Sequence, residues 1–221
     1  MNERLLGIII DSIGKILLPG LTLTIPLTII SFAIALVIAV TVAMIQVADI
    51  KILKQAARFY VWVIRGTPLL VQLYVIFYGL PRLGIVMNPI PAAIIVFAVN
   101  TGAYDSETMR AAIESVSAGQ LEAGYCVGMS YWQTMRRIIL PQAFRTAFPP
   151  LSNSLLSLVK DTSLAANITV AEMFMATQRI VARTYEPLVL YIEVGIIYLL
   201  FSTVLTKLQR MGEKKLSEYG A

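Results

Sequence analysis

Several polar and ionisable side chains lie inside long apolar runs of this sequence, where a charge is costly and usually has a function. Asn100, Tyr104 and Glu107 recur at intervals of four and three residues, which places them on one face of a helix. Lys160 and Asp161 are adjacent in a later apolar run. Carboxylates can accept hydrogen bonds from an ammonium group, and amide groups can donate to a carboxylate. The pattern therefore makes these side chains candidates for a polar path across an apolar medium.

Two further candidates for this path lie beside a proline. Gln72 follows Pro68 by four residues, and Pro68 removes a backbone donor and disfavours helical geometry at Thr67. We expect a kink or a fresh helix start there, with backbone groups freed near Gln72 and Thr67. A structural alternative stays open for two of the charged candidates. In it, Lys160 pairs with an acidic neighbour, and Glu107 lies in water at the membrane surface.

The composition excludes most other classes of protein. Of the 221 residues, 57% are hydrophobic and 14% are charged, with a mean hydropathy of +0.76, whereas soluble domains have about 25% charged residues. The absence of histidine removes the commonest general base and metal ligand, so a hydrolase or a metal centre is not expected. The net charge of +5 does not indicate nucleic-acid binding, because the basic residues flank apolar runs.

The apolar runs predict an all-α integral membrane protein, with a single domain over residues 1–221. About 20 helical residues cross a bilayer, and we expect five spans, at about 16–47, 59–80, 90–112, 150–168 and 188–208. Pro19 and Pro26 predict a start or kink near the first turns of the first span, and the fourth is expected to begin after Pro149 and Pro150.

Basic residues predict the orientation, because they concentrate on the cytoplasmic side of membrane proteins. With the N-terminus outside and the C-terminus in the cytoplasm, twelve of the 18 basic residues fall on the inner side. They are Lys51, Lys54, Arg58, Arg65, Arg110, Arg136, Arg137, Arg145, Lys207, Arg210, Lys214 and Lys215.

Residues 113–148 form a cytoplasmic loop that is too long and too patterned for a simple connection. Its centre mixes apolar and charged residues in a way that fits short amphipathic helices, which seat in a partner's groove or lie on a membrane. Gly124 and Gly128 have the spacing of a membrane dimerisation face, but their neighbours are too polar for one. Gly128 is expected to end one helix and let the chain turn.

This loop resembles the EAA loop of ABC importer permeases. Glu122-Ala123-Gly124, three residues, Gly128, nine residues and Ile138-Ile139-Leu140-Pro141 match that pattern in spacing, with Gly124 in place of alanine. Arg65-Gly66-Thr67-Pro68-Leu69-Leu70-Val71-Gln72 and Lys160-Asp161-Thr162-Ser163-Leu164 add two further matches. Together they resemble importers of polar amino acids, of the histidine, glutamine, arginine and cystine type, over about residues 15–210.

The resemblance implies a type I ABC importer permease whose loop couples to a separate ATPase. The sequence has no Gly-x-x-x-x-Gly-Lys-Ser/Thr loop, so ATP and magnesium are expected on the partner chain and no cofactor on this one. Glu122 is the expected polar contact, Gly128 the turn, and Tyr125, Met129 and Trp132 the apolar anchors. The full coupling set is Glu122, Ala123, Gly124, Tyr125, Gly128, Met129, Trp132, Leu140 and Pro141. Asp161 ranks first on the substrate path, because it falls in the third match.

The resemblance also implies partners and a location. They are an ABC ATPase, an extracytoplasmic substrate-binding protein, a second copy of this permease or a related one, and the lipid of a bacterial plasma (inner) membrane. Cystine is the first choice of substrate, from residues 133–137 and 163–164. An ion-gradient-driven amino acid transporter is the main alternative, but no internal inverted repeat is visible. A membrane-anchored assembly or sensor protein fits the polar spans less well.

Overall fold

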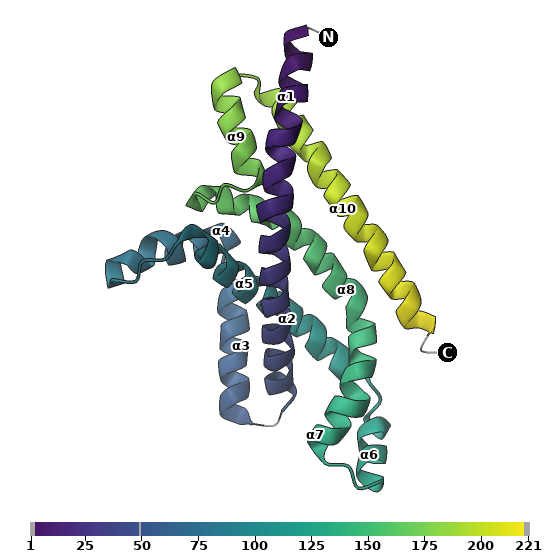
Figure 1. Cartoon of the computed structure of the whole chain (residues 1–221). Coiled ribbons are helices and arrows are strands. Elements are labelled where there is room, and N and C mark those ends of the chain that lie inside the picture. Colours follow the sequence, from purple (N-terminus) through teal and green to yellow (C-terminus); the bar gives the residue numbers. More distant parts are fainter. Residues whose placement is uncertain (1–2, 49, 219–221) are drawn as a thin grey trace. The chain divides into compact units, whose positions relative to one another are not determined.

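The computed structural model describes residues 3–48 and 50–218, and within these ranges every regular element is a helix (Figure 1). The chain divides into two compact units. The first comprises Met1–Ala33, Pro68–Ala98 and Leu155–Lys207, and the second comprises Ile34–Thr67, Val99–Ser154 and Leu208–Ala221.

The first unit opens with a long helix that passes through two prolines. Helix α1 (Glu3–Pro19), a π turn (Gly20–Thr24) and α2 (Ile25–Val47) follow one another without a break. Of the two expectations for Pro19 and Pro26, a helix start or a kink, the start is wrong, since the helix begins at Glu3. A π turn lets the helix continue past both prolines. The Ile25 N–H donates to the Gly20 carbonyl, and this wider turn lies between Pro19 and Pro26, which have no backbone N–H to donate.

The chain breaks instead at Pro68, as the sequence predicts. Helix α3 (Lys51–Arg65) belongs to the second unit and ends before this proline, whose ψ of 137° is extended. A new helix, α4 (Leu69–Tyr74), starts in the first unit and continues as η2 (Val75–Gly79) and η3 (Leu80–Leu83).

Two apolar clusters hold the first unit together. Leu27, Leu73, Phe97 and Ile168 are central to one of them, and they come from α2, α4, α5 (Pro89–Ser115) and η5 (Thr162–Ile168). In the other, Ile16, Met173, Val194 and Ile197 join α1, α9 (Met173–Thr184) and α10 (Pro187–Glu218). Helix α9 packs along α1, which Figure 1 shows in light green beside purple.

In the second unit, small residues let helices approach closely. A Cβ atom at Gly102 of α5 would lie 2.8 Å from Ile38 Cγ2 of α2, and the Tyr60 hydroxyl of α3 donates to the Val99 carbonyl at 2.6 Å.

Helix α8 (Leu140–Asp161) begins before Pro149 and Pro150, so the fourth expected span, if it starts there, starts within a helix. Ala143, Ala147 and Leu151 are buried at four-residue intervals and continue one packed face across both prolines. Tertiary packing thus sustains the helix where two backbone donors are missing.

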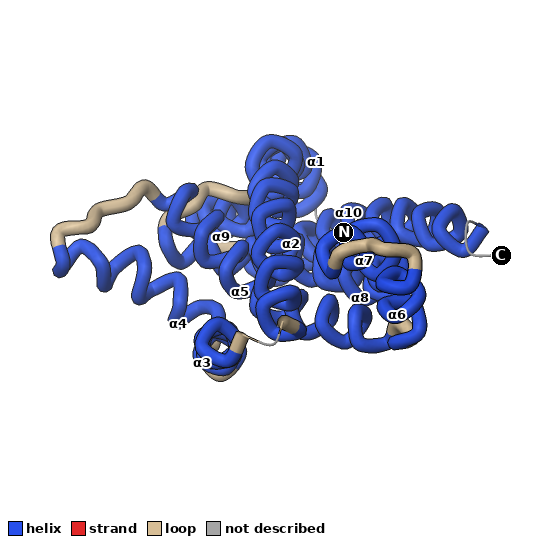
Figure 2. The backbone as a smooth tube through the Cα atoms, turned by 90° about the horizontal axis from the view of Figure 1, so that it is seen from below, coloured by secondary structure: helices blue, strands red, loops and turns tan. Residues whose placement is uncertain are grey.

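Between α5 and α8 the chain forms a hairpin of short helices. It consists of α6 (Ala118–Cys126), α7 (Tyr131–Thr134) and the π turn η4 (Met135–Ile139), so the connection is shorter than the expected loop of residues 113–148. Helices α6 and α7 lie side by side at the lower end of Figure 1, and Figure 2 shows the loop that joins them in tan.

Within the described residues, two helices are long and apolar enough to cross a membrane, Glu3–Val47 and Pro187–Leu216. A third span is counted if Lys51–Arg65 and Leu69–Leu83 form one broken crossing. Helices α5 and α8, which overlap the third and fourth expected spans, are not among them, so the five spans stay a prediction.

Candidate functional site

The hairpin of residues 118–139 turns at Gly128, as the sequence predicts. Helix α6 ends at Cys126, and Gly128 has a φ of +80°, which L side chains rarely adopt. The Gly128 N–H donates to the Tyr125 carbonyl and the Met129 N–H to the Gly124 carbonyl, each at 3.0 Å. These bonds satisfy the last carbonyls of α6 and fix where the chain leaves it.

A capping box starts the second helix of the hairpin. The Ser130 Oγ accepts from the Gln133 N–H at 3.3 Å, and the Gln133 Oε1 accepts from the Ser130 N–H at 2.8 Å. Two otherwise unpaired donors are thereby satisfied, so the loop between α6 and α7 is defined at both ends.

The two helices touch at Gly124 and Thr134. A Cβ atom at Gly124 would lie 2.5 Å from Thr134 Oγ1 and 2.6 Å from its Cγ2. Thr134 is fully buried, and its hydroxyl donates to the Ser130 carbonyl at 3.1 Å. The departure from the EAA pattern at Gly124 therefore has a physical reason, because Thr134 occupies the space of an alanine methyl group.

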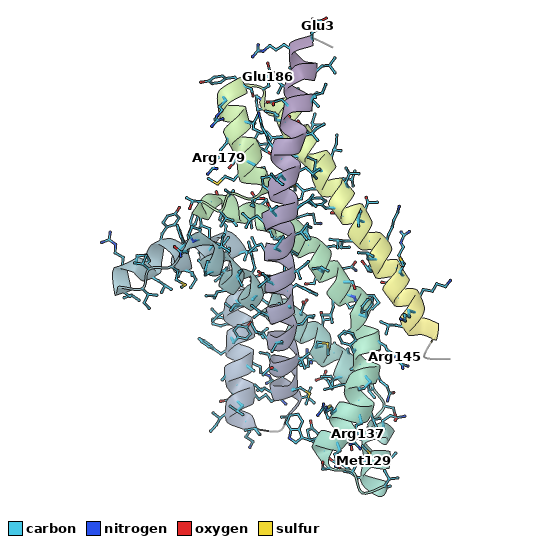
Figure 3. The ribbon with its side chains drawn as sticks, viewed as in Figure 1. Glu3, Met129, Arg137, Arg145, Arg179 and Glu186 are labelled. Carbon is cyan, nitrogen blue, oxygen red and sulfur yellow. The ribbon has the colours of Figure 1, made fainter. Side chains whose placement is uncertain are left out.

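The outer surface of the hairpin carries the expected anchors. Tyr125 and Trp132 are 50% and 68% exposed, Met129 is half-buried, and Glu122 is exposed. Figure 3 labels Met129 on this hairpin. Tyr131 packs edge-on against Trp132 with 6.3 Å between ring centroids, and burial raises the pKa of its hydroxyl.

The remaining members of the expected coupling set lie close by in the chain. Ala123 is exposed on α6, and Leu140 and Pro141 are the first two residues of α8. The structure thus gathers this whole set in one contiguous stretch of the second unit.

The candidates of the substrate path divide between the two units. Asn100, Tyr104, Glu107 and Thr67 belong to the second unit, and Gln72, Lys160 and Asp161 belong to the first. Each group is therefore described in its own unit.

In the second unit, Tyr104 and Glu107 already have partners. The Arg65 guanidinium lies 5.2 Å from the centroid of the Tyr104 ring, and the Tyr104 hydroxyl donates to the Arg65 carbonyl at 3.4 Å. Glu107 accepts from Gln46 Nε2 at 3.0 Å and from Arg110 at 2.9 Å. These contacts give Glu107 partners within the second unit, so it is neither free to bind a ligand nor simply solvated.

Asn100 is buried and Thr67 is exposed, and the Thr67 hydroxyl donates to the Val63 carbonyl at 3.0 Å. Sequence reasoning left Asp105 out of the candidates, although it is 2% exposed and interacts with the Ser154 hydroxyl. A charge within an apolar helix was the signal that identified Glu107, and the same signal applies to Asp105.

In the first unit, Lys160 lies on the wall of a cavity of about 490 Å³. Asp161 follows it, half-buried at the end of α8, and Gln72 is half-buried on α4. Gln72 and Asp161 are not among the residues that line the cavity, which are Lys160, Ser163, Phe174, Tyr191, Val194, Gly195 and Tyr198.

A buried carboxylate that the sequence analysis did not single out holds one wall of this cavity. Glu172 is fully buried and accepts the Phe174 and Met175 N–H groups at 2.8 Å each, so it caps α9. The Tyr198 hydroxyl donates to the same carboxylate at 3.2 Å. Burial raises the pKa of the Glu172 carboxyl and outweighs these donors, which lower it. Glutamate is an uncommon N-cap residue, so the sequence did not indicate that Glu172 begins a helix.

A second buried carboxylate joins α1 to α10. The Ser12 Oγ and the Glu193 Oε2 atoms are 2.6 Å apart, and Glu193 is 7% exposed. This contact ties the first unit's N-terminal helix to its last one.

Comparison with known proteins gives consistent results. The family model described as "Binding-protein-dependent transport system inner membrane component" matches residues 35–218. The L-cystine transport system permease protein TcyB of Bacillus subtilis is 47% identical over 96% of this chain and 91% of its own length. The probable amino-acid ABC transporter permease protein YckA of the same organism is 38% identical, over 90% and 88%. A solved structure titled as an amino acid ABC transporter with histidines superposes with a TM-score of 0.84 at 32% identity, covering 93% of this chain and 96% of that one.

Proposed function

The chain belongs to the family of binding-protein-dependent transport system inner membrane components, and from this premise we propose that it is the membrane subunit of an ATP-driven importer of a polar amino acid. Members of this family are transport permeases and not enzymes. Cystine is the substrate that we propose first, because the relative at 47% identity is named for cystine transport.

The hairpin of residues 118–139 is the observation that carries the proposal. It is fixed by a left-handed glycine and a capping box, yet its aromatic side chains Tyr125 and Trp132 face outward. Exposed aromatic anchors on a rigid element are typical of protein interfaces. The sequence has no phosphate-binding loop, so the ATPase that supplies the energy is a separate chain that carries ATP and magnesium.

We place the chain in the plasma (inner) membrane of a bacterium, with five spans. The N-terminus then lies outside and the C-terminus lies in the cytoplasm. The excess of basic residues on the inner side supports this orientation, and it puts the hairpin on the side where ATP is available.

The transport cycle follows from these partners. An extracytoplasmic binding protein delivers the substrate to this chain and to a second permease, which is another copy or a related chain. ATP binding closes the paired ATPases, moves the docked hairpins, and switches the helices between outward-open and inward-open arrangements as rigid bodies.

The substrate path is proposed to begin with Lys160 and Asp161. A cavity beside Lys160 supports this choice. Gln72, Asn100, Tyr104 and Thr67 are secondary candidates, and Glu107 ranks last because Gln46 and Arg110 already bind it.

Affinity purification of the tagged subunit in mild detergent tests the proposal. We expect an ATPase chain to copurify, its hydrolysis to respond to a binding protein, and the reconstituted complex to take up labelled L-cystine with ATP. Trp132→Ala is expected to release the ATPase chain. Trp62→Ala on α3 is the matched control, because Trp62 is 71% exposed and Trp132 is 68% exposed. Gradient-driven uptake without ATP, or equal retention of the ATPase by both variants, would contradict the proposal.

A further inference from the structure

The cavity of about 490 Å³ in the first unit is lined by one cationic side chain and otherwise by neutral residues. Its polar side-chain groups are the Lys160 ammonium and the hydroxyls of Ser163, Tyr191 and Tyr198, and none of the described residues that line it is acidic. Glu172 is in contact with Tyr198, but it already accepts three hydrogen bonds. The cavity therefore offers a positive charge and hydroxyl groups, and no carboxylate on its wall.

Aromatic rings form much of the remaining wall. Phe174 of α9 and Tyr191 of α10 are stacked, with 5.8 Å between centroids and 26° between planes. Tyr198 is held in place by Glu172 and also interacts with the hydroxyls of Thr162 and Ser163. Rings held in this way make favourable contacts with polarisable groups such as sulfur.

The charge of the wall distinguishes between ligands. Aromatic faces also attract cations, but the Lys160 ammonium on the same wall repels a second positive charge. A carboxylate facing Lys160 is favoured for the opposite reason. The arrangement thus fits an amino acid whose carboxylate faces Lys160 and whose side chain carries no net charge and is polarisable.

Gly195 leaves part of this space open. A Cβ atom built on it meets nothing within 4 Å, so a methyl group at this position of the cavity wall displaces no neighbour. The volume exceeds that of one residue's side chain, and it is lined from α8, η5, α9 and α10.

From these observations we infer that the cavity is a subsite for the transported molecule, which binds a neutral, sulfur-containing amino acid by its carboxylate and chain and discriminates against cationic amino acids. This inference rests on the proposed function and adds to it a location and a basis for selection. Lys160 faces the carboxylate, Phe174 and Tyr191 face the chain, and Glu172 is a positioning residue that acts through Tyr198.

The experiment uses the reconstituted complex with its ATPase and binding protein in proteoliposomes. Initial rates of ATP-driven uptake are measured with labelled L-cystine, with L-arginine as competitor, for the wild type, Gly195→Ala and Gly195→Leu. Gly14→Ala in α1 is the matched control, because its Cβ also meets nothing within 4 Å and Gly14 does not line the cavity.

We expect Gly195→Leu to lower cystine uptake about tenfold or more and Gly195→Ala to lower it several-fold, since occupied space in a binding pocket excludes ligand. Complex assembly and substrate-free ATP hydrolysis should match the wild type, and Gly14→Ala should transport normally. Lys160→Gln should weaken the discrimination against arginine, because it removes the repelling ammonium group. The same binding protein serves all variants, so a change in selectivity belongs to the membrane subunit.

The failures of the two hypotheses are distinguishable. If the wild-type complex shows no ATP-driven amino acid uptake, the proposed function is wrong. If the wild type transports and Gly195→Leu transports equally well with unchanged selectivity, the subsite is wrong and the function stands. If Gly195→Leu loses substrate-free ATP hydrolysis as much as uptake, the cavity is a packing face for lipid or a second copy, and the subsite is also wrong.

Discussion

The coupling hairpin of residues 118–139 and the cavity beside Lys160 assemble their residues in opposite ways. The hairpin is contiguous, and its geometry comes from local bonds at Gly128, Ser130 and Gln133. The cavity draws on residues between Lys160 and Tyr198, and a buried carboxylate, Glu172, holds its wall. A change in the hairpin should therefore uncouple ATP hydrolysis from transport, whereas a change in the cavity should alter which substrate is carried and how fast.

The largest effect is expected at the turn of the hairpin. Gly128→Val places a β-branched residue at a φ of +80°, which costs about 1–2 kcal/mol and shifts the exit of α6. We expect uptake to fall about a hundredfold, because small displacements of a functional group have effects of that order. Uptake and ATP hydrolysis in proteoliposomes measure it.

Gly119→Ala in α6 is the control for this prediction, since its Cβ meets only Oγ of the N-cap residue Ser117, at an ordinary 3.6 Å. Normal uptake by Gly128→Val, with the subunit inserted in the membrane, would contradict the assignment of coupling to the hairpin.

The next largest effect concerns the contact between α6 and α7. Gly124→Ala restores the EAA pattern but places a methyl group 2.5 Å from Thr134 Oγ1, which costs about 1–3 kcal/mol by overpacking. Uptake should fall about tenfold, with selectivity between cystine and arginine unchanged.

Adding Thr134→Ala should restore part of the uptake, because it removes Oγ1 and Cγ2 and leaves the Cβ at 3.1 Å. A double variant no better than Gly124→Ala alone would show that the two residues do not act on each other.

A smaller effect is expected at the wall of the cavity. Glu172→Gln leaves one acceptor oxygen for the two N–H groups that begin α9, so thermal stability should fall by about 1–2 kcal/mol. Unlike the hairpin variants, it should raise the KM for cystine through the loosened Tyr198, with ATP coupling intact.

The same variant carries a test of pH dependence. Because burial raises the pKa of Glu172, its contribution to stability is complete below the ordinary glutamate pKa and is lost as the pH rises through the raised pKa. Thermal unfolding followed over this window should show the loss in the wild type, and Glu172→Gln should flatten it. Parallel pH curves for the two proteins would contradict the assignment.

The smallest effect is expected outside both regions. Asp11 and Lys15 form an exposed ion pair at 2.6 Å on α1. Such pairs contribute about 0–1 kcal/mol, so Asp11→Asn should leave uptake, KM and coupling unchanged in the same assays. A measurable loss of uptake would mean that α1 contributes to transport by a route outside the hairpin and the cavity.

Residues that act locally were accessible from the sequence. The spacing from Glu122 to Pro141, the turn at Gly128 and the break at Pro68 each depend on a few neighbouring residues, and the structure has both the turn and the break. That α8 runs on through Pro149 and Pro150 was not accessible, because buried residues such as Ala143 and Ala147 stabilise the helix despite the two prolines. The π turn between Pro19 and Pro26 is a similar case, since the helix continues there in a wider turn although the prolines disfavour it locally.

Long-range pairs were not accessible. Nothing in the residue types connects Glu172 to Tyr198, Ser12 to Glu193, or Phe174 to Tyr191, because each pair joins different helices of the first unit. The Gly124–Thr134 contact is closer in sequence, but a glycine in place of an alanine reads as a conservative change until the facing residue is known.

The end of α6 also provides an experimental handle. Cys126 is the only cysteine of the sequence and is exposed, two residues before the glycine turn. A maleimide fluorophore would therefore attach to the native chain at a single position, without prior removal of other thiols. Its emission would report in real time when the ATPase engages and releases the hairpin, so the coupling step becomes observable separately from the movement of substrate.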